Sequence, residues 1–284
     1  MRKNILIILL ILVAVVSTVL ILLYINVYRG EETIEMEIQI ENITITEGER
    51  MVRCVKVCPK GEGPFPAILL IHGGAGGNWK TTYGLVTSEP IISIAKMGFI
   101  ILSVDYGPNG IIDTGVGNIK LVGDDINDTL IAYRYLTKLD IVDKDKIFTL
   151  GGSHGGYVSL MMGVFSKVKL AGIIDAYGPT NLTAMELYLH GGINESIADI
   201  LIDYSPVTWV ENYTAPILMI HGKKDELVPI NQSYELADLL KKHGKEHYLY
   251  VYNEPHAFLF DKTSPSYEDA WNKIKNFLLD IINR

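Results

Sequence analysis

A serine between glycines is the residue of this sequence whose setting best suits nucleophilic chemistry. Residues 149–157 read Thr-Leu-Gly-Gly-Ser-His-Gly-Gly-Tyr, a Gly-x-Ser-x-Gly pattern between an apolar run and a segment of helical period. A serine on such a sharp strand-to-helix turn needs residues without a β-carbon two positions before and after it, and Gly151 and Gly155 meet that need. We therefore predict that Ser153 is a nucleophile and that the backbone N–H of His154, at a helix start, stabilises an oxyanion.

A serine hydroxyl becomes a good nucleophile only when a base removes its proton, so a histidine and a carboxylate are expected downstream at strand ends. Asp225 follows the apolar run 216–220, and His256 follows the run 248–252. The chain order Ser, Asp, His is one that such triads use. We predict that His256 is the base for Ser153 and that Asp225 orients it. A structural turn residue is the alternative interpretation of Asp225.

The other acids and histidines near these positions have structural interpretations. Glu226 is adjacent to Asp225 but is expected to project the other way. His221 lies at the mouth of a predicted strand, and His243 and His247 flank a helix end and a strand start. Each of these three histidines is interpreted as structural or solvated.

A glycine-rich loop follows the first buried run of the chain. Residues 71–77 read Ile-His-Gly-Gly-Ala-Gly-Gly, and glycines let backbone N–H groups approach a substrate oxygen closely. The second oxyanion donor is therefore predicted at Gly74 or Ala75, with His72 shaping the loop. Neither Gly-x-Gly-x-x-Gly nor the Walker pattern is present, which argues against a phosphate-binding loop. The histidines and cysteines lack zinc-ligand spacing, so no metal or other cofactor is expected.

The pattern of apolar residues predicts an α/β fold with a mostly parallel central sheet. Residues 33–46 alternate apolar and charged side chains, with Ile34, Met36, Ile38 and Ile40 on the apolar positions, and 51–57 repeat the pattern. These two segments predict an antiparallel hairpin. Wholly apolar runs typical of buried parallel strands follow at 67–71, 99–104, 146–150, 170–176, 216–220 and 248–252. The clearest helices, on both faces of the sheet, are predicted at 118–139, 231–243 and 266–282.

Residues 179–213 interrupt the alternation of strands and helices. The segment holds two glycines, three glycosylation sequons and a short amphipathic piece at 197–202. We interpret it as a small cap inserted after the 170–176 strand, over the site. The rest of the chain from residue 29 to 284 is predicted to be one catalytic domain, a size that fits its length.

An almost unbroken apolar segment, residues 5–25, lies within a predicted transmembrane anchor at residues 1–28. About 20 apolar residues span a bilayer. Arg2 and Lys3 precede the segment, whereas Glu31 and Glu32 follow Arg29, so the positive-inside rule places the catalytic domain outside the cytoplasm. A cleaved signal peptide, which would leave a secreted protein, is the alternative, but its apolar region is normally about 7 to 15 residues long.

Glycosylation sequons add support for a location outside the cytoplasm, because the motif marks surfaces of secreted proteins. They lie at Asn42, Asn127, Asn181, Asn194, Asn212 and Asn231.

The charges exclude one class of partner. The formal net charge is -8, and the bases are scattered without a basic run or aromatic-basic interleaving. Nucleic acid is therefore not an expected partner. The two cysteines, Cys54 and Cys58, are about 13 Å apart if they share one strand, too far for a disulfide. We expect two free thiols.

With these residues in place, the chain resembles the prolyl oligopeptidase family of serine peptidases and its dienelactone-hydrolase-like relatives, which are built on the α/β-hydrolase fold. The resemblance runs from about Pro66 to the C-terminus. Besides the three triad positions, it includes Val104-Asp105-Tyr106, residues 142–147, Gly155-Gly156-Tyr157, Tyr204-Ser205-Pro206-Val207 and, most specifically, residues 221–229. The resemblance implies that Ser153, Asp225 and His256 form the triad of this chain.

Departures from the family bear on the substrate. Only about 40 residues separate the apolar segment from residue 66, too few for the β-propeller of prolyl oligopeptidases. His72 and glycines stand where several members use a tyrosine hydroxyl, an arrangement of acylaminoacyl-peptidase-like and esterase-like members. Gly107 stands where an arginine often follows the Asp-Tyr pair.

The sequence therefore predicts a serine hydrolase that cleaves ester or amide bonds through an acyl-enzyme, in the manner of a prolyl oligopeptidase-like peptidase. Its partners would be a small ester or short peptide and the bilayer around residues 5–25. A membrane-anchored carboxylesterase is the main alternative, and a non-catalytic binding ectodomain is another. The oligomeric state stays open.

Overall fold

The computed structural model describes residues 17, 35–74, 77–106, 119–165, 167–193 and 195–284. The chain divides into Met1–Glu35 and a compact unit, Met36–Arg284, which contains all the elements described below. The predicted anchor at residues 1–28 lies outside the described residues, apart from Ser17. None of the helices in the described residues is both long and apolar enough to cross a bilayer.

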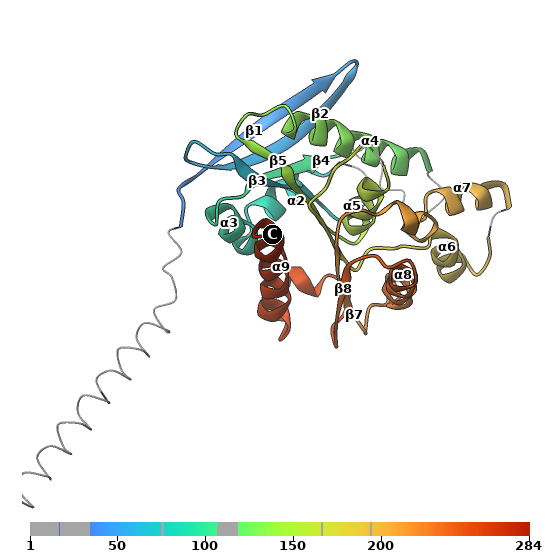
Figure 1. Cartoon of the computed structure of the whole chain (residues 1–284). Helices are drawn as coiled ribbons and strands as arrows, with labels where there is room; N and C mark the ends of the chain where they lie inside the picture. Colours follow the sequence, from blue (N-terminus) through green and yellow to red (C-terminus); the bar gives the residue numbers. More distant parts are fainter. Residues whose placement is uncertain (1–16, 18–34, 75–76, 107–118, 166, 194) are drawn as a thin grey trace, which may run out of the picture. The chain divides into compact units, whose positions relative to one another are not determined.

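One eight-stranded sheet forms the centre of the compact unit (Figure 1). Its strands are β1 (Ile38–Glu47), β2 (Arg50–Pro59), β3 (Phe65–Ile71), β4 (Ile100–Asp105), β5 (Val142–Gly152), β6 (Gly172–Ala176), β7 (Ile217–Gly222) and β8 (His247–Tyr252). The spatial order is β1-β2-β4-β3-β5-β6-β7-β8. The β1–β2 hairpin and the β2–β4 pair are antiparallel, and all other pairs are parallel. The predicted mostly parallel sheet with an N-terminal hairpin is confirmed.

Helices cover both faces of the sheet, so its central strands are buried on both sides. Every residue of β4, β6 and β7 is buried, in agreement with their mostly apolar sequences. On one face the core includes side chains of α4 (Ile119–Leu136), α5 (His154–Val164) and α8 (Asn231–Lys242). On the other it includes α2 (Trp79–Val86), α3 (Glu89–Lys96) and α9 (Tyr267–Ile282) (Figure 1).

Two strands differ from their predicted form. β5 begins at Val142 rather than at residue 146, because Val142 pairs with Phe65, the first residue of β3. The charged residues 143–146 that follow Val142 are exposed or half-buried. In β1 the apolar positions change face: Ile40 is 41% exposed, whereas Ile43 and Ile45 pack against the core. The apolar side chains of β1 therefore do not all lie on one face, although the predicted hairpin itself is present.

The segment after β6 forms short helices instead of continuing the sheet. These are α6 (Leu182–His190), η1 (Glu195–Ile197), α7 (Ala198–Asp203) and η2 (Pro206–Asn212). Thr180 ties its beginning to α8, since its backbone N–H donates to the side-chain oxygen of Gln232 at 2.7 Å and its hydroxyl donates to the Gln232 carbonyl at 2.7 Å. Both cysteines lie on β2 as free thiols, as expected.

Candidate active site

Ser153 occupies a strained turn between β5 and α5. Its backbone has φ 56° and ψ −126°, a positive φ that non-glycine residues rarely adopt. A β-carbon on Gly151 would lie 2.2 Å from the carbonyl oxygen of Gly155, and one on Gly155 would lie 2.2 Å from that of Ile71. Only glycine fits at these two positions, so the flanking glycines of the motif make this turn sterically accessible.

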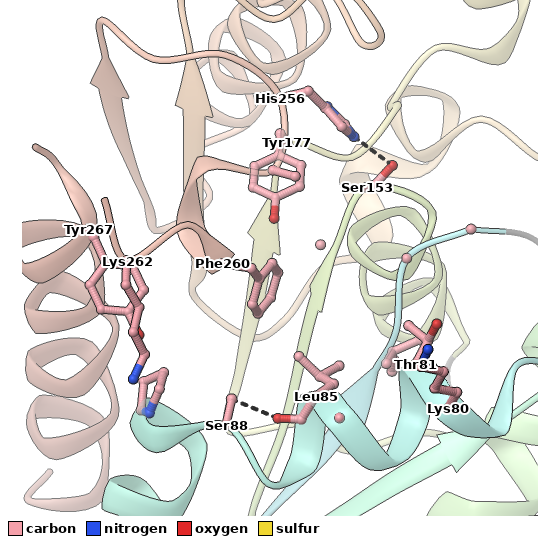
Figure 2. Close-up of a pocket in the computed structure, with 17 residues that line it drawn as sticks. Lys80, Thr81, Leu85, Ser88, Ser153, Tyr177, His256, Phe260, Lys262 and Tyr267 are labelled. Carbon is pink, nitrogen blue, oxygen red and sulfur yellow. Dashed lines mark hydrogen bonds between the residues drawn. The ribbon is translucent and has the colours of Figure 1, made fainter. Parts of the chain in front are cut away.

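The turn brings the serine hydroxyl to His256, which follows β8 (Figure 2). The distance from His256 Nε2 to Ser153 Oγ is 3.0 Å, and that from His256 Nδ1 to Asp225 Oδ2 is 2.6 Å. An ionised carboxylate only accepts hydrogen bonds, so Nδ1 carries the proton. In the neutral imidazole Nε2 is then an acceptor for the Ser153 hydroxyl. The three residues selected from the sequence thus lie in one hydrogen-bonded chain.

Asp225 sits on the loop after β7 and is held by several donors. Its Oδ1 accepts hydrogen bonds from the N–H groups of Leu227 at 3.0 Å and Val228 at 2.8 Å. Burial alone would raise the pKa of Asp225, but hydrogen bonds from His221 and His256 and from the Val228 N–H outweigh it and hold the pKa well below its usual range. The Asp225 carboxylate is therefore ionised at neutral pH, where it can accept the hydrogen bond from His256.

His221 is buried and structural, in agreement with its sequence interpretation. Its Nδ1 is 2.7 Å from Ser233 Oγ, and its Nε2 is 2.8 Å from the Val228 carbonyl and 3.3 Å from Asp225 Oδ2. The contact with Asp225 was not expected from the sequence. The adjacent Glu226 is exposed, as its predicted direction requires.

The predicted oxyanion donors lie on two elements that meet beside Ser153. His154 is the first residue of α5, so its N–H belongs to the positive end of that helix. Gly74, with φ +80°, lines the cavity next to Ser153, whereas Ala75 lies outside the described residues. A positive φ at Gly74 is a conformation that only glycine adopts at no cost.

Tyr106 holds the loop that carries Gly74. Its hydroxyl is within hydrogen-bond reach of the carbonyls of His72 and, at 3.0 Å, of Gly74. Its ring stacks on the His72 imidazole, with centroids 4.2 Å apart and planes at 3°. Burial lowers the pKa of His72, which keeps the imidazole neutral. His72 therefore shapes the loop, and the Asp-Tyr motif supplies a loop support that the sequence did not reveal.

A second histidine–aspartate pair joins α4 to the start of α5. His154 Nε2 lies 2.8 Å from Asp125 Oδ2, and the Asp125 side chain is fully buried while that of His154 is 17% exposed. Burial raises the pKa of Asp125 and the hydrogen bond from His154 opposes this rise. The sequence analysis did not identify Asp125 as a site residue. The one available signal is its spacing of one helical turn from Asp128 and Thr129, which lie on the same buried face of α4.

A cavity of about 550 Å³ opens beside Ser153 and His256 (Figure 2). Its walls come from residues 73–74, from α2 and the start of α3, from Tyr177 after β6, and from residues 256–267. The volume is that of a small-molecule site. None of the described residues in 179–213 lines it. Of this segment, η2 packs against α5 and α8, and the Tyr188 hydroxyl of α6 donates to the Glu226 carbonyl at 2.9 Å, next to Asp225. That the segment caps the site stays a prediction.

Comparisons with known proteins place the chain in a family. The model of the BD-FAE family matches residues 55–240. The chain is 28% identical over 194 residues to the uncharacterized peptidase YtmA of Bacillus subtilis (strain 168), covering 65% of this chain and 72% of that protein. It is 25% identical over 235 residues to acylamino-acid-releasing enzyme 1 of Oryza sativa subsp. japonica, covering 75% of this chain but 30% of the rice protein.

The fold is also that of a solved peptidase structure. Pyrococcus horikoshii acylaminoacyl peptidase superposes with a TM-score of 0.72 at 19% identity, over 84% of this chain and 41% of that chain. The chain thus spans less than half of the rice enzyme and of the solved protein. The present chain belongs to the BD-FAE family and is a serine hydrolase of the α/β-hydrolase fold, similar to the prolyl oligopeptidase peptidases.

Proposed function

We propose that this chain hydrolyses esters or amides, including peptide bonds, through an acyl-enzyme on Ser153. His256 takes the proton of Ser153 as its oxygen attacks the substrate carbonyl, and Asp225 fixes the imidazole tautomer and stabilises the imidazolium. His256 then donates that proton to the leaving group, and water releases the acid by the reverse sequence. The observation that carries the proposal is the pair of distances, 3.0 Å and 2.6 Å, that link Ser153, His256 and Asp225.

The negative charge of the tetrahedral intermediate needs donors that are already in place. We propose the His154 N–H as one donor and the N–H of Gly74 or Ala75 as the other. Support for this assignment comes from the place of His154 at the start of α5 and from the position of Gly74 in the cavity wall. Tyr106 and Asp125 hold the two donor segments through the contacts described above.

Peptide hydrolysis is the first candidate activity, because relatives of this chain are named as peptidases and acylamino-acid-releasing enzymes. The chain spans only 30% of the rice enzyme. The substrates of that enzyme are therefore only a proposal for this protein. Carboxylester hydrolysis is the second candidate. The glycine loop beside Ser153, with Gly73 and Gly74 in the cavity wall, is compatible with it as well as with a peptidase.

Substrate profiling separates the two candidates. The purified chain is given 4-nitrophenyl esters of graded acyl length beside N-acetylaminoacyl, aminoacyl and prolyl 4-nitroanilides. Comparable turnover of an amide supports a peptidase, and turnover of esters alone supports a carboxylesterase. Ser153→Ala must abolish either activity. A folded wild-type chain that hydrolyses none of these substrates would support the non-catalytic alternative instead.

We also infer that residues 5–25 anchor the chain and that the catalytic unit lies outside the cytoplasm. The support is the length of the apolar segment, the charges at Arg2 and Lys3, and the exposed sequon residues Asn42 and Asn127. Protease added to intact cells should degrade the catalytic unit, and full protection would contradict this orientation. N-terminal sequencing of the mature protein distinguishes the anchor from a cleaved signal.

A further inference from the structure

The cavity beside Ser153 has an apolar middle and a basic rim. Ile71, Leu85 and Phe260 are among the apolar side chains that line it, and its charged lining residues are Lys80 and Lys262. No aspartate or glutamate is present among the described residues of the lining. The chain as a whole carries 33 acidic against 25 basic residues, so the cavity has the opposite charge balance. This contrast indicates a local preference for an anion.

The two lysines come from distant parts of the chain and approach the cavity from different sides. Figure 2 shows Lys80 next to Thr81 on α2 and Lys262 next to Tyr267 at the start of α9, with Ser153 and His256 at the upper end of the view. A group bound with its reacting carbonyl at Ser153 would therefore extend past Leu85 and Phe260 toward one or both ammonium groups.

Neither lysine forms an ion pair with any of the described residues. Lys56 and Lys60 illustrate the usual case, since each pairs with a carboxylate of β1 or of the residues before it, at 3.0 Å and 2.6 Å. Lys80 and Lys262 are exposed and lack such a carboxylate among the described residues. Their charges are therefore available to a ligand without the loss of an ion pair to any of the residues that the structure describes.

The position of Lys80 is not explained by the stability of its helix. Lys80 is the second residue of α2, and no acidic residue lies in the first turn of that helix. A cation there is repelled by the positive end of the helix dipole, whereas an acidic residue would be favoured. A ligand anion at the cavity rim would remove this unfavourable interaction.

We propose that the substrate of this site carries a carboxylate at the far end of the apolar portion that occupies the cavity, and that Lys80 and Lys262 determine this specificity. The inference rests on the proposed hydrolase function and adds the class of substrate. A carboxylate carries a single charge, which an exposed ammonium group on either side of the cavity can balance without a dedicated cradle. A phosphate site would be expected to surround its ligand with several backbone N–H groups or a guanidinium.

A matched pair of esters tests the proposal. The neutral member is 4-nitrophenyl hexanoate, and the anionic member is the mono-4-nitrophenyl ester of adipic acid, which has the same number of acyl carbons. After subtraction of uncatalysed hydrolysis, kcat/KM for the anionic ester should be about tenfold higher than kcat/KM for the neutral ester at low salt. This is the size expected for the charges of two exposed cations. The ratio of the two values should fall as salt is raised, because 1 M salt shortens the screening length to about 3 Å.

Single substitutions identify the residues responsible. Lys80→Gln and Lys262→Gln should each lower the anionic-to-neutral ratio about threefold, which is the size of one exposed ion pair. The Lys80→Glu/Lys262→Glu double variant should prefer the neutral ester. Lys241→Gln removes an exposed lysine on α8 outside the cavity and serves as the matched control, with an unchanged ratio. Equal ratios in the wild type and all variants would overturn the proposal.

A binding measurement keeps this inference separate from the proposed catalysis. Calorimetry on the full chain with Ser153→Ala compares 4-phenylbutyrate with 4-phenylbutyramide, which differ in charge but hardly in shape. Tighter binding of the carboxylate, weakened by Lys80→Gln or Lys262→Gln, supports the proposal even for a substrate that is never cleaved. Equal binding of the two compounds overturns it. If the wild type hydrolyses neither these esters nor the 4-nitroanilides of the substrate profile while it binds the carboxylate, the proposed hydrolase function fails and the anion site stands.

Discussion

Two histidine–aspartate pairs meet near Ser153, and they differ in what each imidazole reaches. In the Asp225–His256 pair the second ring nitrogen lies 3.0 Å from the serine hydroxyl. In the Asp125–His154 pair the histidine directly follows Ser153 in the chain, and its Nε2 is bound to Asp125 at 2.8 Å. The first pair can therefore move a proton, whereas the second holds the main chain at the start of α5.

The two carboxylates also differ in their electrostatic surroundings. Asp225 accepts hydrogen bonds from two backbone N–H groups and from histidines, and its pKa is held well below the usual range. For Asp125 burial dominates and raises the pKa, because a single imidazole donor opposes it. The same two side chains can therefore serve proton transfer on loops at strand ends and positioning on packed helices.

The largest expected effect comes from Asp225→Asn. An asparagine amide would donate to His256 Nδ1 and leave Nε2 protonated, so that Nε2 no longer accepts the Ser153 proton. We expect kcat to fall by about 10³- to 10⁴-fold with the fold intact. Steady-state kinetics and circular dichroism check this result. Glu226→Gln, at the exposed neighbouring position, is the control and should retain full activity.

A smaller effect is expected for the positioning pair. Asp125→Ala removes the acceptor for His154 and loosens the backbone that carries the oxyanion N–H. Because loss of an oxyanion donor costs about 10² to 10³ in kcat, its displacement should cost about 10- to 100-fold, with little change in KM. Asp125→Asn keeps a carbonyl acceptor and should recover most of the rate.

The control for this pair is Asp124→Ala on the same helix. Asp124 pairs with Arg50 at 3.2 Å and not with His154. Its substitution should leave kcat unchanged. A loss of activity in Asp124→Ala as large as in Asp125→Ala would mean that general weakening of α4, and not the His154 contact, accounts for both.

Asp175 sharpens the comparison, because it is a buried carboxylate without a hydrogen bond to an imidazole. Burial raises its pKa to about 6, although His221 and the Gly178 N–H act in the opposite direction. In the unfolded chain an aspartate has a pKa of about 3.9. Between these values the native state keeps a proton that the unfolded chain has lost, so this group makes the protein less stable as pH rises from about 4 to 6.

Asp175→Asn cannot ionise and should escape that loss. The stability of the variant relative to wild type should rise on the order of 1–2 kcal/mol between pH 4 and pH 7. Any cost of placing an amide there is independent of pH, so denaturant unfolding at both pH values isolates the titration. An identical difference at pH 4 and pH 7 would show that Asp175 ionises normally in the folded protein.

The triad and the sheet were predictable from the sequence for the same reason. Wholly apolar runs marked the parallel strands, and chemistry-bearing residues just past three of those runs, Ser153, Asp225 and His256, come together in the folded chain. Glycine spacing predicted the turn at Ser153 because steric exclusion acts between close neighbours in sequence. The membrane anchor and the site roles of these residues stay predictions.

The remaining parts of the site depend on packing between distant segments. Asp125 meets His154 only because α4 packs against α5, and Lys80 and Lys262 share a cavity only because α2 lies near the loop before α9. The broken pattern of residues 179–213 predicted a departure from the alternation of strands and helices, and short helices occupy the segment. The side on which they pack depends on contacts such as Thr180 with Gln232, which no local signal reveals.

The central claim is that Ser153 is the nucleophile of an acyl-transfer hydrolase. A fluorophosphonate probe reacts with a serine that an adjacent base has activated, and mass spectrometry locates the adduct. The wild-type chain should carry one phosphonyl group on Ser153, and Ser153→Ala should carry none. Labelling of Ser153→Ala to the wild-type extent, or no labelling of the folded wild type, would contradict the claim.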